Sequence, residues 1–482
     1  MPCTWKCRAA CWWNRGTPEV AMRIFSAIGT ALAAIFAASA SLPVRAAELR
    51  VSPGAALQSV LERAAEGDVV ILPAGDYRGP VRIDRRLILQ GEPGAILTGP
   101  GNGSVVTVLA SGSVVRGLTV RGSGVDLPAL DSGIFVAKTA VGAVVEGNRI
   151  EGNLYGIYLH GAQESVARDN VIIGIKEGRR NEAGNGISVW NAPDAQVLNN
   201  DISFGRDGIF VAASKRNRFS GNHFRDLRFA IHYMYTNDSE ISGNVSTGNA
   251  VGFAVMYSHR LVVENNISDG DRDHGFLFNY ANGSRISSNA VYGRLQPADR
   301  WLGAGSRSQA GEHGVPVSEP ASGSVAGMRL GPEKCVFIYN ANQNRFRDNR
   351  FEGCEIGIHF TAGSEGNEMS GNAFIRNRNQ VKYVGTRYLD WSKGGRGNYW
   401  SDNPAFDLNG DGIGDTAYRP NDLVDKVLWT APQAKLLVNS PAVQVIRWAQ
   451  AQFPALLPGG VVDSAPLMTP PALATGADRE LK

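Results

Sequence analysis

Thioether and imidazole side chains gather in one short stretch of this sequence, and their spacing suggests a metal site. Met234 and Met256 are 22 residues apart, and His232 stands two residues before Met234. His259 follows Met256 by three residues, and His274 belongs to the next repeat. Thioether sulfur favours Cu(I) over hard cations, and imidazole also binds copper. These five residues therefore predict a Cu(I) site, provided that the fold brings neighbouring repeats together.

A structural explanation of the same residues stays open. Met in a strand commonly serves as apolar filler. Seven Met and seven His residues in a chain of 482 can also cluster by chance.

A second group of possible ligands lies near the C-terminus. Oxygen donors recur there in the pattern of the first half of an EF-type Ca²⁺ loop, at Asp407, Asn409, Asp411 and Asp415. The twelfth position of such a loop needs Glu, and this sequence has Tyr418. The segment predicts either a Ca²⁺ loop or an Asx-rich turn without metal.

A repeat in the sequence predicts the strands and turns that carry these candidate metal ligands. The phrase V-x-G-N-x-I recurs mostly every 22 or 23 residues, with its asparagines at Asn148, Asn170, Asn200, Asn222, Asn244, Asn266, Asn289, Asn349 and Asn372. A fixed period in the twenties is typical of stacked repeats. Apolar residues then alternate with other residues, as in β-strands.

Three short strands joined by tight turns fit into one repeat. The sequence therefore predicts an all-β fold, a right-handed parallel β-helix whose coils lie about 4.8 Å apart. Each Asn is expected at a turn, where its amide binds local backbone groups and stacks on the Asn of the next coil. With Ile231 and Tyr233 pointing inward, His232 and Met234 point to the outer face, where we expect an open site.

The longer spacings and the chain ends define the domain organisation. The β-helix is predicted over 47–400, with a small insertion near 177–184 and a long one over 295–332 that is rich in Gly, Ser, Ala and Pro. A helical segment at 55–65 predicts a short cap, and one at 442–453 predicts a second helix that either caps the stack or docks on a partner. Residues 401–482 hold the Asp/Asn loop, the second of these helices and a tail.

The first 46 residues are predicted to be an upstream leader followed by a signal peptide. Arg23 precedes an apolar stretch, and Val44-Arg45-Ala46 matches a cleavage site after Ala46, so the protein is expected to be exported. Removing this segment changes the formal net charge from +3 to about −1. The mature chain therefore offers no basic surface for nucleic acid.

Only Cys335 and Cys354 remain after cleavage of the leader. In an oxidising compartment they can form a disulfide. Their offset relative to the repeat equally allows two separate buried thiols, so the sequence leaves both states open.

An enzymatic alternative comes from Asp271-Arg272-Asp273-His274. This phrase is a distant match to the Asp-Pro-His-Asp signature of alginate C5-epimerases, and carboxylates beside a His can perform acid-base chemistry on a sugar. No separate carboxylate pair with a Lys or Arg column accompanies it. An exported polysaccharide lyase or epimerase, or a sugar-binding β-helix, is the alternative function.

Several phrases together resemble the NosD family. They are Ala230 to Asp238 (AIHYMYTND), Val251 to His259 (VGFAVMYSH), Asp273 to Asn279 (DHGFLFN), Lys334 to Asn340 (KCVFIYN), Gly397 to Asp402 (GNYWSD), Asp411 to Asp415 (DGIGD), and the tail from Ser440 to Pro454. The resemblance covers roughly residues 48 to 470.

The resemblance implies a periplasmic, non-enzymatic β-helix that handles copper. Members of the family act with an ABC transporter, made of the NosF ATPase and the NosY membrane subunit, and with the copper lipoprotein NosL. Together they assemble the copper-sulfide centre of apo nitrous oxide reductase. The ligands named above are inferred from the coil register, because the resemblance supplies only the copper pathway. The insertion at 295–332 and the leader before Met22 depart from the family pattern.

Overall fold

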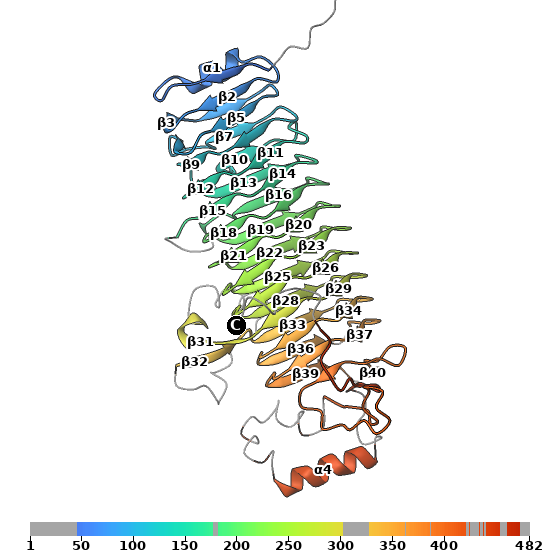
Figure 1. Ribbon diagram of the computed structural model, residues 1–482. Coiled ribbons are helices and arrows are strands. Elements are labelled where there is room, and N and C mark those ends of the chain that lie inside the picture. The colour runs from blue at the N-terminus through green and yellow to red at the C-terminus, as the bar shows by residue number, and fades with distance from the viewer. Residues whose placement is uncertain are drawn as a thin grey trace, which may run out of the picture. The chain divides into compact units, whose positions relative to one another are not determined.

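The repeated strands stack into three parallel sheets, which run the length of the coil stack (Figure 1). The computed structural model describes residues 46–176, 182–301, 327–361, 363–385, 387–420, 424, 433, 437, 440–453 and 460–472. The predicted leader, the tip of the small insertion and most of the long one lie outside these residues. The predicted fold class is confirmed: the chain is a right-handed parallel β-helix.

Each complete coil contributes one strand to each sheet, in chain order. The first sheet contains 13 strands, namely β1 (Glu48–Arg50), β2 (Val69–Leu72), β5 (Ile88–Gly91), β8 (Val114–Arg116), β11 (Val144–Glu146), β14 (Val166–Arg168), β17 (Gln196–Leu198), β20 (Arg218–Ser220), β23 (Glu240–Ser242), β26 (Val262–Glu264), β29 (Arg285–Ser287), β34 (Arg345–Arg347) and β37 (Glu368–Ser370). The second sheet contains 13 strands, namely β3 (Gly75–Arg78), β6 (Ala95–Thr98), β9 (Thr119–Arg121), β12 (Arg149–Glu151), β15 (Val171–Ile173), β18 (Asp201–Ser203), β21 (His223–Arg225), β24 (Val245–Thr247), β27 (Ile267–Asp269), β30 (Ala290–Tyr292), β35 (Arg350–Glu352), β38 (Ala373–Ile375) and β41 (Tyr399–Trp400). The third sheet contains 12 strands, namely β4 (Val81–Ile83), β7 (Val106–Val108), β10 (Ser132–Val136), β13 (Tyr155–His160), β16 (Ile187–Trp190), β19 (Asp207–Ala212), β22 (Phe229–Met234), β25 (Val251–Met256), β28 (His274–Asn279), β33 (Lys334–Tyr339), β36 (Ile356–Thr361) and β39 (Asn379–Val384).

The repeating asparagines form a continuous hydrogen-bonded ladder at the turn between the first and second sheets. Asn222 donates from its backbone N and from Nδ2 to Oδ1 of Asn244, at 3.0 Å in each case. The same two bonds join every pair along the series from Asn148 to Asn372. Because each amide satisfies backbone groups inside the turn, the ladder fixes the register of neighbouring coils.

The ladder continues further than the sequence pattern indicated. Asn372 donates to Asn398, and Asn398 donates from its backbone N to Oδ2 of Asp463 at 2.6 Å. Trp400 also donates to this carboxylate, at 2.8 Å. Asp463 follows β42 (Gly460–Val462), which pairs with β40 (Tyr388–Asp390). The C-terminal segment therefore closes the end of the ladder.

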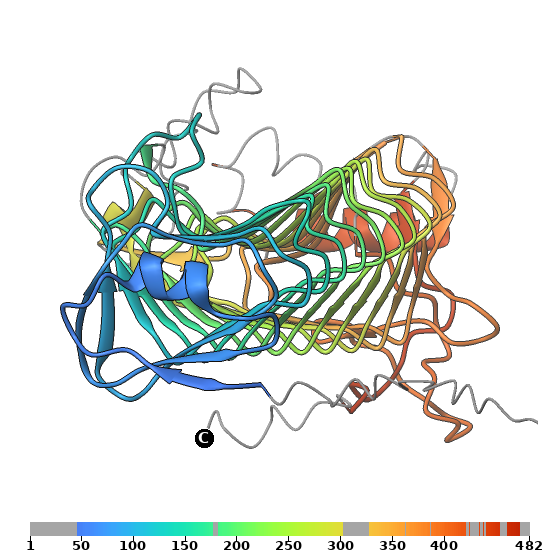
Figure 2. The ribbon, with the colours of Figure 1, turned by 90° about the horizontal axis from the view of Figure 1, so that it is seen from above.

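Two helices were predicted, and both are present. Helix α1 (Leu57–Arg63) lies across the open end of the N-terminal coil, where Leu57 and Leu61 are buried (Figure 2). Helix α4 (Pro441–Gln452) begins after Ser440, whose side chain accepts a hydrogen bond from the backbone N of Val443.

The long insertion leaves the coil stack intact, as predicted. Strands β30 and β35 pair in register on either side of it, as do β28 and β33. Its two ends form an antiparallel ribbon of β31 (Arg294–Pro297) and β32 (Met328–Gly331), and the 3-10 helix Ala298–Trp301 follows β31. Residues 302–326 lie outside the described part.

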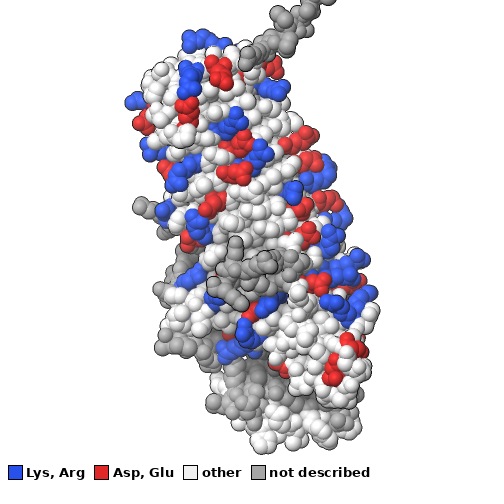
Figure 3. All heavy atoms as spheres, in the orientation of Figure 1, with Lys and Arg blue, Asp and Glu red and all other residues white. Residues whose placement is uncertain are grey.

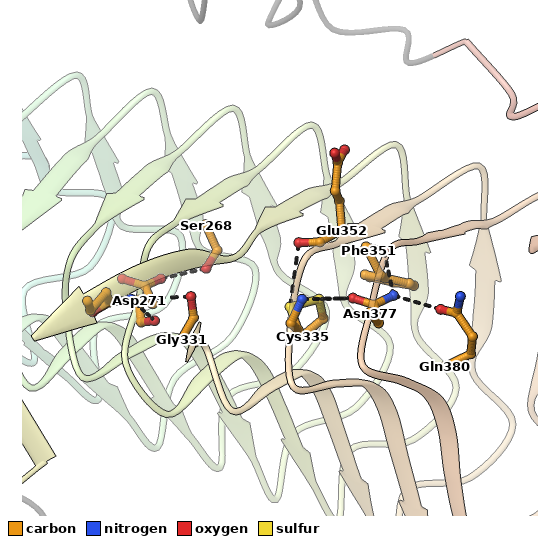
Figure 4. Close-up of a disulfide and its surroundings, with 10 residues drawn as sticks. Ser268, Asp271, Gly331, Cys335, Phe351, Glu352, Asn377 and Gln380 are labelled. Atoms are coloured by element: carbon orange, nitrogen blue, oxygen red, sulfur yellow. Dashed lines mark hydrogen bonds between the residues drawn. A yellow bond between two sulfur atoms is a disulfide. The ribbon is translucent and has the colours of Figure 1, made fainter. Parts of the chain in front are cut away.

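A disulfide joins Cys335 and Cys354, which settles the question that the sequence left open. Both residues are fully buried inside the coil, and Figure 4 shows Cys335 beside Asn377, whose Oδ1 accepts from the backbone N of Cys354 at 2.9 Å. Cys335 stands at the start of β33, directly after the insertion. The bond therefore fixes the coil at the point where the chain returns to the stack.

Candidate functional site

The candidate copper ligands lie on strands β22 and β25 of the third sheet. The inward residues of β22 are Ile231 and Tyr233, both buried in the core. His232 and Met234 alternate with them and lie on the outer side. The predicted facing of this strand is therefore confirmed.

Met234 and Met256 are register partners on these adjacent strands. Neighbouring strands lie about 4.8 Å apart, so the two thioethers emerge side by side. His232 pairs with Ala254, one alternation away on the same two strands. The fold therefore brings His232, Met234 and Met256 to one patch.

His232 is not exposed, which corrects the expectation of an open site. Only 7% of the residue is accessible, although both methionines are half-buried. Phe229 and Phe210 flank the imidazole edge-on, with ring centroids at 4.8 and 5.2 Å. An apolar cluster of Phe229, Val251 and Ala254, with Met256 packed against it, adjoins the ring. Phe210 of the preceding coil and Phe229 of the same strand cover the imidazole, which the alternation of inward and outward residues does not reveal.

A buried carboxylate holds one nitrogen of His232. Oδ2 of Asp207 lies 3.3 Å from Nδ1 of His232, and Asp207 is fully buried. Arg228 donates from Nε and Nη2 to the two oxygens of the same carboxylate, at 2.8 and 2.6 Å. Burial alone would raise the pKa of Asp207, but the hydrogen bonds and charges of His232 and Arg228 outweigh it and lower the pKa to about 2. The carboxylate is therefore ionised at neutral pH and acts only as an acceptor.

The other nitrogen of His232 is consequently available to a ligand. Because Asp207 can only accept, Nδ1 donates the hydrogen bond, and in the neutral form of this imidazole the lone pair is therefore on Nε2. Nε2 is buried and has no hydrogen-bond partner among the described residues. A carboxylate that orients a histidine in this way is a common second partner of metal-bound imidazole.

The two other predicted histidines lie apart from this patch. His259 is in the turn beyond β25, where its backbone N donates to Asn237 and its Nδ1 lies 3.3 Å from Nδ2 of Asn282. His274 begins β28, where it pairs with Val251, and its ring lies against Phe337 of the following coil, with centroids 5.5 Å apart. Burial and the charge of Lys334 lower the pKa of His274 to about 4.

The Asp/Asn segment folds as a compact turn whose side chains bind its own backbone. Asp407 accepts from the backbone N of Gly410 at 2.7 Å and of Gly412 at 2.8 Å. Asn409 accepts from Asp411, Asp411 from Ile413, and Asp415 from Leu408. The Asx-rich turn is therefore present, and Ca²⁺ binding by it stays a prediction.

Within the described ranges, no group of three or more His, Cys, Asp and Glu side chains is placed to hold a metal ion. Copper at this patch would therefore depend on thioether sulfur. No helix in the same ranges is long and apolar enough to cross a membrane. Figure 3 shows acidic and basic side chains side by side along the stack, in keeping with the small formal net charge of +3 of the chain.

The carboxylates of the epimerase-like phrase do not form a sugar site. Asp271 is fully buried at the turn between the second and third sheets, where it accepts from Ser268 at 2.6 Å (Figure 4). It also accepts from the backbone N of Asn249, at 2.8 Å. Asp273 is paired with Arg272 at 2.7 Å and is also buried. These carboxylates are structural partners of the coil.

Sequence reasoning missed Asp207 and Arg228. A signal was present, because Asp207 stands at the start of an apolar strand and Arg228 follows it by 21 residues, close to one repeat. It also missed three tyrosines that directly follow the last residues of β22, β25 and β28, namely Tyr235, Tyr257 and Tyr280.

Comparisons with known proteins agree with the sequence phrases. A family model for the periplasmic copper-binding protein NosD matches residues 174–405, and one for the right-handed β-helix region matches 96–202. A probable ABC transporter binding protein NosD of Stutzerimonas stutzeri is 40% identical over 400 residues, covering 83% of this chain and 86% of that protein. The protein of the same name from Pseudomonas aeruginosa is 41% identical over 401 residues, covering 83% and 88%.

Among solved structures, a family 28 exopolygalacturonase of Yersinia enterocolitica is similar in fold. The two share 12% sequence identity with a TM-score of 0.51, over 70% of this chain and 77% of the enzyme. At this identity the likeness concerns the fold alone.

Proposed function

The chain belongs to the NosD family, and on this basis we propose that it is a periplasmic accessory protein that binds Cu(I) and passes it on. Its cargo serves the copper-sulfide centre of nitrous oxide reductase. The relatives are named for binding an ABC transporter, and for this chain the partners are a NosF ATPase, a NosY membrane subunit, the lipoprotein NosL and the apo-reductase.

The copper-binding patch consists of His232, Met234 and Met256. The observation that carries the proposal is the orientation of the His232 imidazole. Asp207 holds its Nδ1, and its Nε2 is buried without a hydrogen-bond partner in the described structure. The two thioethers on the same strands are register partners. Two thioethers and one neutral imidazole form a soft donor set that suits Cu(I). The apolar surroundings disfavour hydrated hard cations.

Release of the metal requires two states that differ in affinity. ATP-driven movement of the attached transporter would change the packing of the coils that carry β22 and β25. Since the thioethers come from two different coils, a small shift between these coils separates the donors.

The chain acts without catalysis in this proposal. The competing function, a polysaccharide lyase or epimerase, needs carboxylates on an exposed groove. The Asp271 and Asp273 carboxyl groups are buried in structural contacts, so they do not support it.

An anaerobic Cu(I) titration of the mature chain against a competing chelator tests the proposal. We expect tight binding of Cu(I) by the wild type and its loss in the variant Met234→Ile/Met256→Ile, which keeps apolar volume in the strands. Met468→Ile, a half-buried methionine in the C-terminal segment, is the matched control and should bind as the wild type does. Equal copper binding by wild type and the double variant would remove the site assignment, and absence of binding in the wild type would remove the proposed function.

A further inference from the structure

Two histidines and two lysines gather on four successive strands of the third sheet, β28, β33, β36 and β39 (Figure 1). They are His274, Lys334, His359 and Lys382. His274 pairs in register with Lys334, and His359 pairs with Lys382. Neighbouring strands lie about 4.8 Å apart, so the members of each pair are close. We call these four residues the Lys–His patch.

Phe337 connects the two pairs of the patch. The centroid of its ring lies 5.5 Å from that of His274 and 4.9 Å from that of His359. The ammonium nitrogen of Lys334 lies 5.4 Å from the centre of the same ring. Both pairs therefore adjoin one aromatic side chain, and they form a single patch.

The patch lies on the outer side of the sheet. Val381 and Tyr383 flank Lys382 on β39, and both belong to the core. The residues on either side of His359 also belong to the core. Alternation along the strands then places Lys382 and His359 on the outer side. All four members of the patch are half-buried, so a ligand from solvent can reach them.

Positive charge exceeds negative charge at this patch. Glu333 accepts from Lys334 at 2.9 Å and from Arg329 at 3.3 Å, so one carboxylate is shared by two cations. Lys382 has no ion pair among the described residues. The carboxylates on the adjoining turns are already paired, namely Asp273 with Arg272 at 2.7 Å and Glu355 with Arg378 at 3.1 Å.

The excess of positive charge affects the ionisation of the patch. Burial and then the charge of Lys334 lower the pKa of Lys382, although Glu333 opposes the change. Burial and the two lysines also lower the pKa of His359 to about 3. Both imidazoles are therefore uncharged at neutral pH, while the two ammonium groups repel each other. An anion between the ammonium groups would relieve this repulsion.

The two imidazoles can donate hydrogen bonds without gaining charge. Nδ1 of His274 and Nδ1 of His359 are buried and have no hydrogen-bond partner among the described residues. Nε2 is therefore the nitrogen of each ring that a ligand from solvent can meet. A neutral imidazole that carries its proton on Nε2 donates to an acceptor there.

This set of donors selects the class of ligand. A metal cation is disfavoured, because Lys334 and Lys382 repel it. A phosphate group carries about two negative charges at neutral pH and several strong acceptor oxygens, which suit two ammonium groups and two N–H groups on four strands. A carboxylate has only two oxygens, so it reaches fewer of these donors.

We propose that the Lys–His patch is a binding site for a phosphate group, held by the ammonium groups of Lys334 and Lys382 and by Nε2 of His274 and His359. The phosphate group is either free in solution or carried by a lipid. The site lies on the same sheet as the copper patch, but it does not depend on copper binding. It gives His274 a role different from that of a copper ligand.

Calorimetric titration of the mature chain with inorganic phosphate tests the proposal. We expect saturable binding of one phosphate with a Kd of about 1 mM or tighter. Lys382→Gln should weaken binding by about tenfold or more, because a charge-assisted hydrogen bond is lost. Its melting temperature without phosphate should match that of the wild type, since no described ion pair is broken. Absence of saturable binding by the wild type, or an equal Kd for the wild type and Lys382→Gln, would overturn the proposal.

The matched control is Lys215→Gln. Lys215 is exposed and also has no ion pair among the described residues, but it lies outside the patch. This variant should bind phosphate as the wild type does. An equal loss of phosphate binding in Lys215→Gln and Lys382→Gln would show a general effect of charge and would overturn the assignment.

The imidazoles are tested by a second variant and by NMR. His274→Phe/His359→Phe keeps aromatic rings beside Phe337 and removes the two N–H donors, so it should weaken phosphate binding by about tenfold or more. In the wild type, phosphate should shift the Nε2 resonances of His274 and His359, and leave those of His223, which is exposed on the second sheet. Unshifted Nε2 resonances of the patch at saturating phosphate would contradict the proposed donors.

Competing ligands establish the class and the source of the phosphate. Acetate at equal ionic strength should not displace phosphate, and displacement with equal affinity would overturn the choice of phosphate. Phosphatidylcholine vesicles that contain phosphatidylglycerol test the lipid source. Wild-type protein that sediments with them, together with loss of this binding in Lys382→Gln, would identify a lipid headgroup as the ligand. Binding of free phosphate that these vesicles do not reduce would identify a soluble ligand.

The phosphate site and the copper patch can fail separately. Lys382→Gln should bind Cu(I) as the wild type does, and Met234→Ile/Met256→Ile should bind phosphate as the wild type does. Loss of phosphate binding in the methionine variant would overturn the location of the phosphate site, whatever the copper titration shows.

Discussion

Nδ1 of His232 lies 3.3 Å from Oδ2 of Asp207, a buried carboxylate 25 residues earlier on the neighbouring strand. The contact orients the imidazole of His232. Its Nδ1 is held by the carboxylate, and its Nε2 has no hydrogen-bond partner among the described residues. The contact also distinguishes His232 from the other histidines predicted as ligands, because His259 and His274 have no carboxylate contact of this kind in the described structure.

The first prediction separates these three histidines. His232→Gln should lower Cu(I) affinity by about tenfold or more, since it removes the imidazole donor. His259→Gln and His274→Gln should leave the affinity unchanged, because both residues lie away from the methionine pair. The measurement is anaerobic competition with a chelator. An affinity loss in His259→Gln comparable to that in His232→Gln would contradict the arrangement.

The second prediction concerns pH and Asp271. Burial raises the pKa of this carboxyl to about 7, although hydrogen bonds from Ser268 and Ser246 oppose the rise. A carboxyl with a raised pKa in the folded state keeps its proton there while the unfolded chain has lost it. Its stabilisation is therefore fully present below about pH 4, the unfolded value, and is lost as the pH rises through 7. The effect corresponds to roughly 1.4 kcal/mol for each unit of pKa shift.

Asp271→Asn should remove this loss and make the protein more stable than the wild type at pH 8. The amide suits the position, because Asn249 occupies the same place one coil earlier and donates from Nδ2 to Ser246 at 2.8 Å. Urea unfolding at pH 5 and pH 8 provides the measurement, with the exposed Asp226→Asn as control. An identical dependence of stability on pH in Asp271→Asn and the wild type would show that Asp271 does not titrate as expected.

The third prediction concerns the disulfide. The bond closes a loop between residues 19 apart in sequence, so its reduction should lower the free energy of unfolding by about 3 kcal/mol. Cys335→Ala/Cys354→Ala should show a similar loss and no further response to reductant. Denaturant unfolding with and without dithiothreitol measures both effects. Equal stability of the oxidised and reduced wild type would contradict the prediction.

The fourth prediction concerns the Asx-rich turn. If it binds Ca²⁺, millimolar Ca²⁺ should raise the melting temperature of the wild type, because a ligand of the folded state stabilises it. Asp411→Asn should abolish the increase, since it removes one of the predicted carboxylate ligands, and Mg²⁺ serves as the control cation. A melting temperature that does not respond to Ca²⁺ would leave only the Asx-rich turn.

The sequence by itself determined the coil, the asparagine ladder and the pairing of Met234 with Met256. These features depend on two short periods, the alternation within a strand and the repeat between coils, and both can be counted along the chain. The family membership was also apparent from local phrases such as Gly397 to Asp402.

Only the tertiary structure decided which groups are covered, paired or strained. Phe210 and Phe229 enclose His232, and Asp207 reaches it from another coil, because side chains of different coils share the outer face. Asp271 points into the turn where Asn249 is its neighbour. Cys335 and Cys354 form a disulfide because the chain returns from the long insertion to the coil stack at Cys335, next to the coil that contains Cys354. Such contacts depend on the directions of individual side chains, which no period in the sequence encodes.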